Sequence, residues 1–193
     1  IVYTSSNLSI ASVDASSGEV TLLGTGTADI TASKAGDDFY LPASASYPLN
    51  VEKSAQVISF EADGINAIFG SPSFTNLIND GPGGGEITYS SADTGVVTLN
   101  SSTGVVTIVG AGNAIVTANK AADTNYAAAI ASYTVSIAQA GQTALLFEDA
   151  GPLEKVFGDA LFTNSVSGGN GIGGITYTSD NTDVATVNEN SGE

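Results

Sequence analysis

The sequence contains neither cysteine nor histidine, and these absences remove many of the side chains that proteins use for chemistry. Without cysteine, the chain can form no disulfide bond and offers no thiol nucleophile. Without histidine, it has no imidazole to act as a general base. Together the two absences exclude a metal site made of nitrogen or sulfur ligands. No serine lies in a G-x-S-x-G motif, so we predict that the chain is not an enzyme.

Basic residues are also scarce: the chain has four lysines and no arginine, against twenty acidic residues. The net charge of −16 excludes the basic surface that nucleic acid requires, and it disfavours anionic membranes. Such acidity suits a soluble, self-repelling chain or one that collects divalent cations. The most apolar stretch, Ala127–Phe147, is interrupted by polar residues, so we expect no direct insertion into a membrane.

The chain repeats itself: the stretch that begins at Ile1 returns at Ile87 and begins again at Ile175. A period near 87 residues is too long for a solenoid unit and fits one small β-sandwich. Neighbouring repeats of the same chain are therefore the first expected partners. We predict three parts: residues 1–53 as the C-terminal part of one repeat, 54–140 as a complete repeat, and 141–193 as the N-terminal part of a third.

Apolar and polar residues alternate along the repeat, which is the pattern of half-buried β-strands. Ala28, Ile30 and Ala32 show this alternation, and the next copy has apolar residues at the same places. Glycine-containing turns separate the runs at hairpin spacing, and no window shows a helical stripe. The pattern predicts an all-β fold in which Thr107 and Thr117 face outward. Seven residues are expected to be largely buried: Tyr89, Val97, Leu99, Ile108, Val116, Val135 and Ile137.

A longer motif gives the repeat a family resemblance. Residues Tyr3–Ala32 follow the pattern Y-x-S-x-x-x-x-x-A-x-V-D-x-x-S-G-x-V-T-x-x-G-x-G-x-A-x-I-T-A, which resembles the bacterial immunoglobulin-like domains of group 2. The opening Q-x-I-S-F at Gln56–Phe60 and the K-A-x-D-x-x-Y loop at Lys34–Tyr40 resemble a long variant found in tandem in very large bacterial surface proteins. The resemblance implies tandem immunoglobulin-like β-sandwich domains at the extracellular surface of a bacterium.

Carboxylates make calcium the one cofactor that the sequence suggests, because calcium takes six to eight oxygen ligands. The candidate ligands are Asp37 and Asp38, with Asp123 in the next copy. No cluster matches a fixed calcium-binding loop, so solvated turn carboxylates are the alternative. The adjacent pair also fails to predict glycoside hydrolysis, because the next copy has Thr124 in place of Asp38.

Two pairs of residues at equivalent positions could have a chemical or binding role instead of a structural one. Lys34 and Lys120 occupy the same place in successive copies, where some surface adhesins cross-link lysine to asparagine. Such a bond needs a buried carboxylate beside it, which the spacing does not single out, and we expect lysines exposed at a strand end. Tyr40 and Tyr126 could stack on a ligand, but their recurrence beside an aspartate-containing turn favours loop anchors.

These features favour a structural function. We expect a non-catalytic stalk or filament segment of a large bacterial cell-surface adhesin. The alternatives are a module whose glycine-rich or aspartate-containing loops bind a carbohydrate, such as surface polysaccharide, or a host or other cell-surface protein, and spacer domains of a secreted polysaccharide-acting enzyme. Sugar-binding faces usually offer exposed aromatic rings, and the chain has only seven tyrosines and seven phenylalanines, mostly at recurring, core-like positions.

Overall fold

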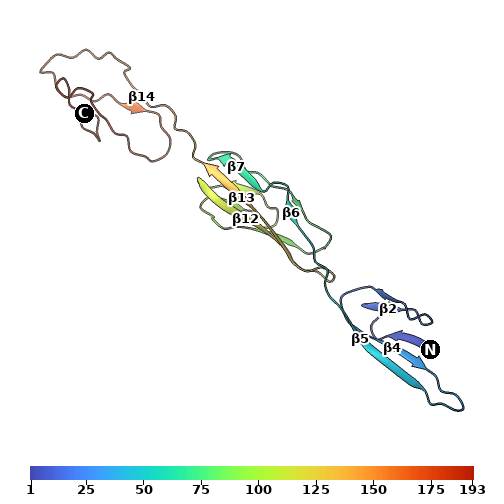
Figure 1. Ribbon diagram of the computed structural model, residues 1–193. Coiled ribbons are helices and arrows are strands. Elements are labelled where there is room, and N and C mark those ends of the chain that lie inside the picture. The colour runs from blue at the N-terminus through green and yellow to red at the C-terminus, as the bar shows by residue number, and fades with distance from the viewer. The chain divides into compact units, whose positions relative to one another are not determined.

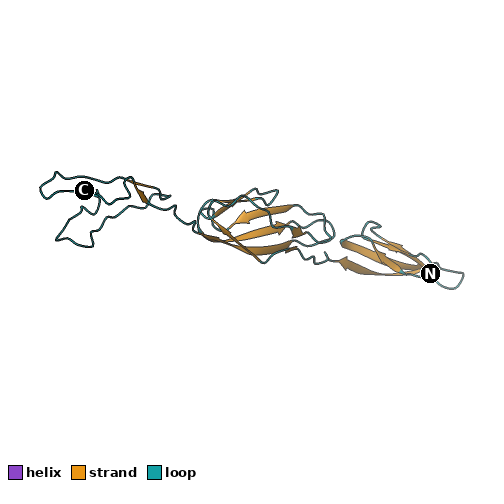
Figure 2. Cartoon of the chain, turned by 90° about the horizontal axis from the view of Figure 1, so that it is seen from above, coloured by secondary structure: helices purple, strands orange, loops and turns teal.

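The computed structural model describes residues 1–193 and contains fifteen β-strands and no helix (Figures 1 and 2). There is accordingly no long apolar helix of the kind that crosses a membrane. The chain divides into two compact units, Ile1–Gln139 and Ala140–Glu193. The prediction of an all-β, immunoglobulin-like sandwich is confirmed. Below, residues 1–53, 54–140 and 141–193 are called the N-terminal, central and C-terminal segments.

The central segment is a two-layer sandwich. Its larger sheet has the strand order β7-β13-β12-β9, in which β7 runs parallel to β13 and the other neighbours are antiparallel. Figure 1 labels three of these strands, β7, β13 and β12. Short pairs, β10 with β11 and β6 with β8, complete the fold. The strands are β6 (Ser59–Phe60), β7 (Gly64–Ile68), β8 (Ile78–Asn79), β9 (Ile87–Ser91), β10 (Val97–Leu99), β11 (Val106–Ile108), β12 (Gly112–Lys120) and β13 (Ala129–Ala138).

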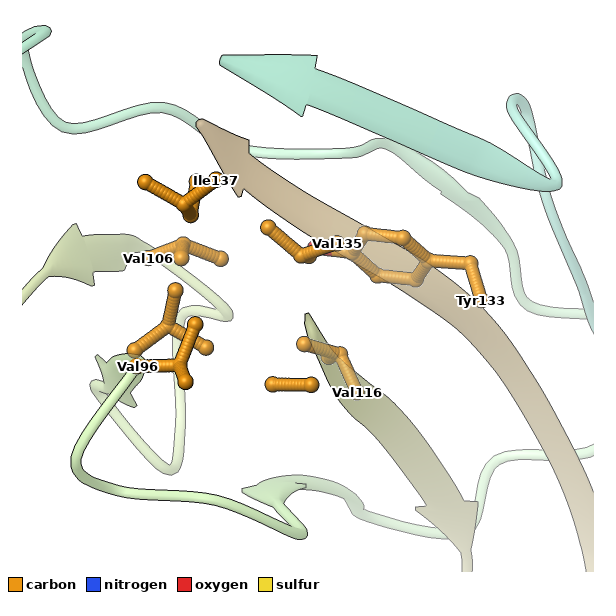
Figure 3. Close-up of a cluster of buried hydrophobic side chains, with 8 residues drawn as sticks. Val96, Val106, Val116, Tyr133, Val135 and Ile137 are labelled. Carbon is orange, nitrogen blue, oxygen red and sulfur yellow. The ribbon is translucent and has the colours of Figure 1, made fainter. Parts of the chain in front are cut away.

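The core of this sandwich joins β10 and β11 to β12 and β13 (Figure 3). The buried positions alternate along each long strand, as predicted, while Thr107 is exposed and Thr117 is half-buried. Among the seven residues predicted to be buried, Tyr89, Leu99 and Ile108 are only half-buried. The buried cluster also holds four residues outside those seven: Val96, Val106, Ala114 and Tyr133.

Phe60 connects the short β6–β8 pair to this core. Its ring packs edge-on against Tyr133, with 4.6 Å between the ring centroids. Burial raises the pKa of the Tyr133 hydroxyl to about 12, with a smaller contribution from Tyr89. Phe74, after β7, also packs against the core.

The N-terminal segment repeats one half of this architecture. Its sheet has the order β1-β4-β5, and β2 pairs with β3. Tyr3 lies opposite Ala32 as Tyr89 lies opposite Ala118, so the register is the same. Pro48 is exposed on β5 at the edge of the sheet, where its missing N–H group costs no ladder bond. The strands are β1 (Val2–Ser5), β2 (Ala11–Val13), β3 (Val20–Leu22), β4 (Gly26–Lys34) and β5 (Ala43–Val51).

The C-terminal segment contains one strand pair, β14 (Leu146–Phe147) with β15 (Val166–Ser167). Ala185 and Val187 match Val97 and Leu99 of β10 in sequence, but they form no strand. In the central segment, the equivalent strand β10 pairs with β11.

Candidate functional site

The structure brings together the two loops that the sequence singled out. The glycine-rich loop, residues 80–86, lies beside the aspartate-containing loop, residues 121–126, in the central segment. The N–H of Gly84 donates a hydrogen bond to Oδ2 of Asp123, at 2.6 Å. Ala121 donates its own N–H to the carbonyl oxygen of Glu86, at 2.9 Å. We call these two loops, with the side chains that hold them, the loop cluster.

Asp123 shapes its own loop. Its Oδ1 accepts hydrogen bonds from the N–H groups of Asn125 and Tyr126, at 2.8 and 2.7 Å. The three N–H donors, of Gly84, Tyr126 and Asn125 in order of effect, hold the pKa of the carboxyl below its ordinary value of 3.8. Asp123 therefore stabilises a loop with its charge.

The same device occurs in the N-terminal segment. Asp37 Oδ1 accepts from the N–H groups of Phe39 and Tyr40 at 2.8 and 2.9 Å, and the Asp37 N–H donates to the Tyr40 carbonyl. Tyr126 is half-buried and Tyr40 is exposed, so only the central copy resembles the expected loop anchor.

Lys120 contradicts the expectation of an exposed lysine at the strand end. Only 2% of its surface is exposed, and its ammonium group donates hydrogen bonds to the main-chain carbonyl oxygens of Asp80 and Gly83. These carbonyls belong to the glycine-rich loop, which folds over the end of β12 and covers the side chain. Lys34, the equivalent residue, is exposed. Because the two positions share a sequence pattern, only the presence of the loop distinguishes them.

Gln56 is the cluster member that sequence reasoning missed. Its Nε2 donates to the Ala127 carbonyl at 2.7 Å, and its Oε1 accepts from the Gly83 N–H at 3.2 Å. It thus ties the glycine-rich loop, and the residue that follows the aspartate-containing loop, to the start of the segment. Gln56 recurs as Gln142 in the next copy, and this recurrence could have identified it from the sequence. Gln142 likewise accepts a hydrogen bond from the N–H of Asn170.

The calcium candidates do not form a ligand set in this arrangement. Asp37 and Asp123 direct oxygens at main-chain N–H groups of their own loops, and Asp38 is exposed beside Asp37. No group of three or more acidic side chains lies close enough to hold a metal ion. Calcium binding therefore stays a prediction from composition, and we derive no chemistry through it.

A shallow groove runs beside Lys120, between the ends of β9, β12 and β13. A similar groove occupies the same place in the N-terminal segment, beside Lys34. None of the residues that line either groove is aromatic, so neither offers a ring on which a sugar could stack. The lining of the first includes Glu86, Thr88, Asn119, Ala128 and Ile130, and that of the second includes Val2, Ser33, Pro42 and Ala43.

Comparison with known families identifies one local similarity. Residues 1–36 match the family model described as "Intimin, immunoglobulin-like domain". The match covers the Tyr3–Ala32 motif and supports an immunoglobulin-like domain of the adhesin type. No curated protein matches the chain.

Solved structures give distant likenesses. The S-layer protein rSbsC(31-844) is 20% identical with a TM-score of 0.36, and the similarity covers 76% of this chain and 21% of that one. Human protocadherin-24 EC1-2 is 14% identical with a TM-score of 0.36, covering 73% and 82%. A SusE-like surface located polysaccharide binding protein from Bacteroides thetaiotaomicron is 13% identical with a TM-score of 0.32, covering 72% and 29%. At such scores these likenesses indicate no function.

Proposed function

We propose that the chain is a non-catalytic structural segment of a bacterial surface adhesin, built from tandem immunoglobulin-like repeats and located outside the cell. The observation that carries the proposal is the recurrence of the same internal hydrogen bonds in successive copies. The Asp37 and Asp123 loops are one example. A second is the hairpin loop closed by Asp14, Asn100 and Asn188, whose side-chain oxygens each accept two main-chain N–H groups.

What recurs in these loops is the part that holds each copy in shape. The carboxylate and amide oxygens of the loops accept hydrogen bonds from main-chain N–H groups of the protein itself. Lys120 and Gln56 likewise donate hydrogen bonds to main-chain carbonyl oxygens. Groups bound in this way stabilise a fold and are not offered to a ligand. The net charge of −16 adds repulsion between chains and favours an extended, soluble array. The neighbouring repeats are the main partners in this function.

The test is a replacement in the intact surface protein of the organism that encodes the chain. Residues 54–140 are deleted in frame, or replaced by an unrelated sandwich domain of similar length, and adhesion of the cells is measured. A structural role predicts that deletion weakens adhesion and that the unrelated domain restores it. If the unrelated domain does not restore adhesion, and the isolated chain binds a glycan or a cell-surface protein, then the alternative of a binding module is correct.

A further inference from the structure

The turn between β3 and β4 of the N-terminal segment touches the aspartate-containing loop of the central segment. Thr25, in this turn, donates a hydrogen bond from its side-chain hydroxyl to the main-chain carbonyl oxygen of Thr124. Its neighbour Gly24 also lies near the loop, because a Cβ atom placed on it would be 3.9 Å from Oδ1 of Asn125. Both segments belong to the same compact unit. The contact therefore joins two successive repeats.

The N-terminal segment holds this turn in place. The N–H groups of Leu23 and Gly24 both donate to the carbonyl oxygen of Ile10, at 2.8 and 3.1 Å. A Cβ atom on Gly24 would lie 2.7 Å from the carbonyl oxygen of Ser9, so the turn packs directly on the main chain of its own segment. The Thr25 hydroxyl is therefore presented from a turn that is fixed to its own segment.

The central segment fixes the other side of the contact. The Ser54 N–H donates to the Asn125 carbonyl at 2.8 Å, and the Ser54 carbonyl accepts from the Ala127 N–H at 2.9 Å. On the other flank, the carboxylate of Asp123 is bonded to the glycine-rich loop. Thr124 lies between these two anchors, so its carbonyl oxygen is a fixed acceptor.

The linker between the two segments is short and lies near the same loop. β5 ends at Val51, and Ser54 is already bonded to the aspartate-containing loop, which leaves Glu52 and Lys53 between them. Three main-chain N–H groups lower the pKa of Asp123 most, and the positive charge of Lys53 lowers it further. Domains joined by a small polar interface ordinarily move relative to one another. An attachment beside the linker therefore decides how far this joint bends.

The equivalent turn of the central segment lacks the donor. Gly110 and Gly112 repeat the two glycines that flank Thr25, but the residue between them is Ala111, which has no hydroxyl. The turn is otherwise built in the same way, because two of its N–H groups donate to the Val96 carbonyl at 2.9 and 3.1 Å. Two turns of the same construction thus differ at the position that makes the contact.

We propose that the aspartate-containing loop of a repeat is a docking surface for this turn of the preceding repeat, and that the residue at the position of Thr25 sets the stiffness of the joint. A threonine there closes the joint with a hydrogen bond to the main chain of the next repeat. An alanine, as at position 111, leaves the joint free to bend. The inference rests on the proposed structural function, because a stalk acts through the stiffness of its joints.

The test is the distance distribution between two spin labels on the full 193-residue chain, measured by double electron–electron resonance. Because the chain has no cysteine, Thr21→Cys and Thr98→Cys place labels at these two sites alone, on exposed positions of β3 and β10. We expect one narrow distribution. A broad distribution would show that the two segments move independently, and it overturns the proposal. The structural function would stand in that case, because domain replacement in cells tests it separately.

Variants of the labelled chain test the hydrogen bond. Thr25→Val removes the hydroxyl, keeps the shape of the side chain, and should lower the ratio of docked to undocked joints about two- to tenfold, which broadens the distribution. Thr25→Ser keeps the donor and should keep the distribution narrow. Thr4→Val is the matched control, because Thr4 is exposed on β1 of the same segment, opposite Thr31 of β4. If Thr25→Val leaves the distribution narrow, or Thr4→Val broadens it as much, the proposal is wrong.

A second measurement reports the contact itself and needs no label. The N–H of Asn125 belongs to the same peptide group as the Thr124 carbonyl that accepts the hydrogen bond. We therefore expect the amide resonance of Asn125 in the nuclear magnetic resonance spectrum to shift on Thr25→Val and to stay in place on Thr4→Val. An Asn125 resonance that does not respond to Thr25→Val shows that the turn and the loop do not touch in solution, and this result also overturns the proposal.

Discussion

The ring of Tyr89 lies directly over Gly104, so closely that a Cβ atom on the glycine would sit 3.0 Å from Cε1 of the ring. Gly104 has a φ of +70°, which a residue with a side chain rarely adopts. The Tyr89 N–H donates to the Ser101 carbonyl of the same hairpin loop, at 2.9 Å. The strand and the hairpin that follows it are thereby fastened together. The same contact recurs in the other two segments, between Tyr3 and Gly18 and between Tyr177 and Gly192.

This contact predicts that Gly104→Ala destabilises the central segment by about 1–3 kcal/mol, through strain at positive φ and the clash with the ring. The free energy of unfolding is measured with urea. Gly141→Ala is the control, because a Cβ atom there meets nothing within 4 Å. Equal effects of the two substitutions would contradict the role assigned to the ring contact.

Lys120→Ala is expected to destabilise the chain by about 1–3 kcal/mol, because the main-chain carbonyls of Asp80 and Gly83 lose a charged donor that is itself buried. Lys34→Ala, which changes the equivalent but exposed residue, should leave the melting temperature of the monomer within experimental error. Both proteins are melted at low concentration and followed by circular dichroism. A comparable loss in both variants would show that burial of Lys120 by the glycine-rich loop does not matter for stability.

Acid should destabilise the chain in part through Asp123. Hydrogen bonds to the charged carboxylate hold the folded-state pKa of Asp123 below 3.8. The stabilisation that Asp123 gives the folded state is therefore complete above pH 3.8, and it is lost as the pH falls through the folded-state pKa. We expect Asp123→Asn to reduce the slope of unfolding free energy against pH on the acid side. The slope should not vanish, because hydrogen bonds from Ser17 and Ser16 also lower the pKa of Asp14. Asp38→Asn, at an exposed carboxylate, should leave the slope unchanged.

Calcium at constant ionic strength separates the two interpretations of the carboxylates that the composition leaves open. Because Asp37 and Asp123 accept main-chain N–H groups and no three carboxylates converge in this arrangement, solvated turn carboxylates predict that calcium and magnesium shift the melting temperature equally. A specific site would instead stabilise the fold by an amount that grows with the logarithm of free calcium. A selective calcium effect that is lost on Asp123→Asn would show that the loop rearranges into a ligand set.

The strand pattern was predictable because alternation reports directly which face of a strand is buried. Val116 and Val135 were assigned to the core in this way, and both are fully buried. Tyr89 was also expected there, but one side of its ring covers the hairpin glycine at the edge of the core, and it is only half-buried. Alternation gives the face of a residue and does not give its distance from the edge of the sheet.

The loop cluster was harder to predict because its members are far apart in sequence and act on the main chain. Lys120 and Lys34 stand in the same local pattern, yet one is buried and the other exposed. The difference comes from residues 80–86, whose carbonyl groups have no sequence signature. The role of Gln56 depends in the same way on loops that a strand pattern does not place.

The most direct test of this account is to produce residues 54–140 alone and measure their unfolding. The central claim is that each repeat is a self-contained structural unit whose contacts are repeated from copy to copy. The account predicts that the fragment unfolds cooperatively, with the Tyr133 hydroxyl titrating at a pKa of about 12 as in the intact chain. A fragment that is unfolded, while residues 1–139 together fold as one compact unit, would contradict it.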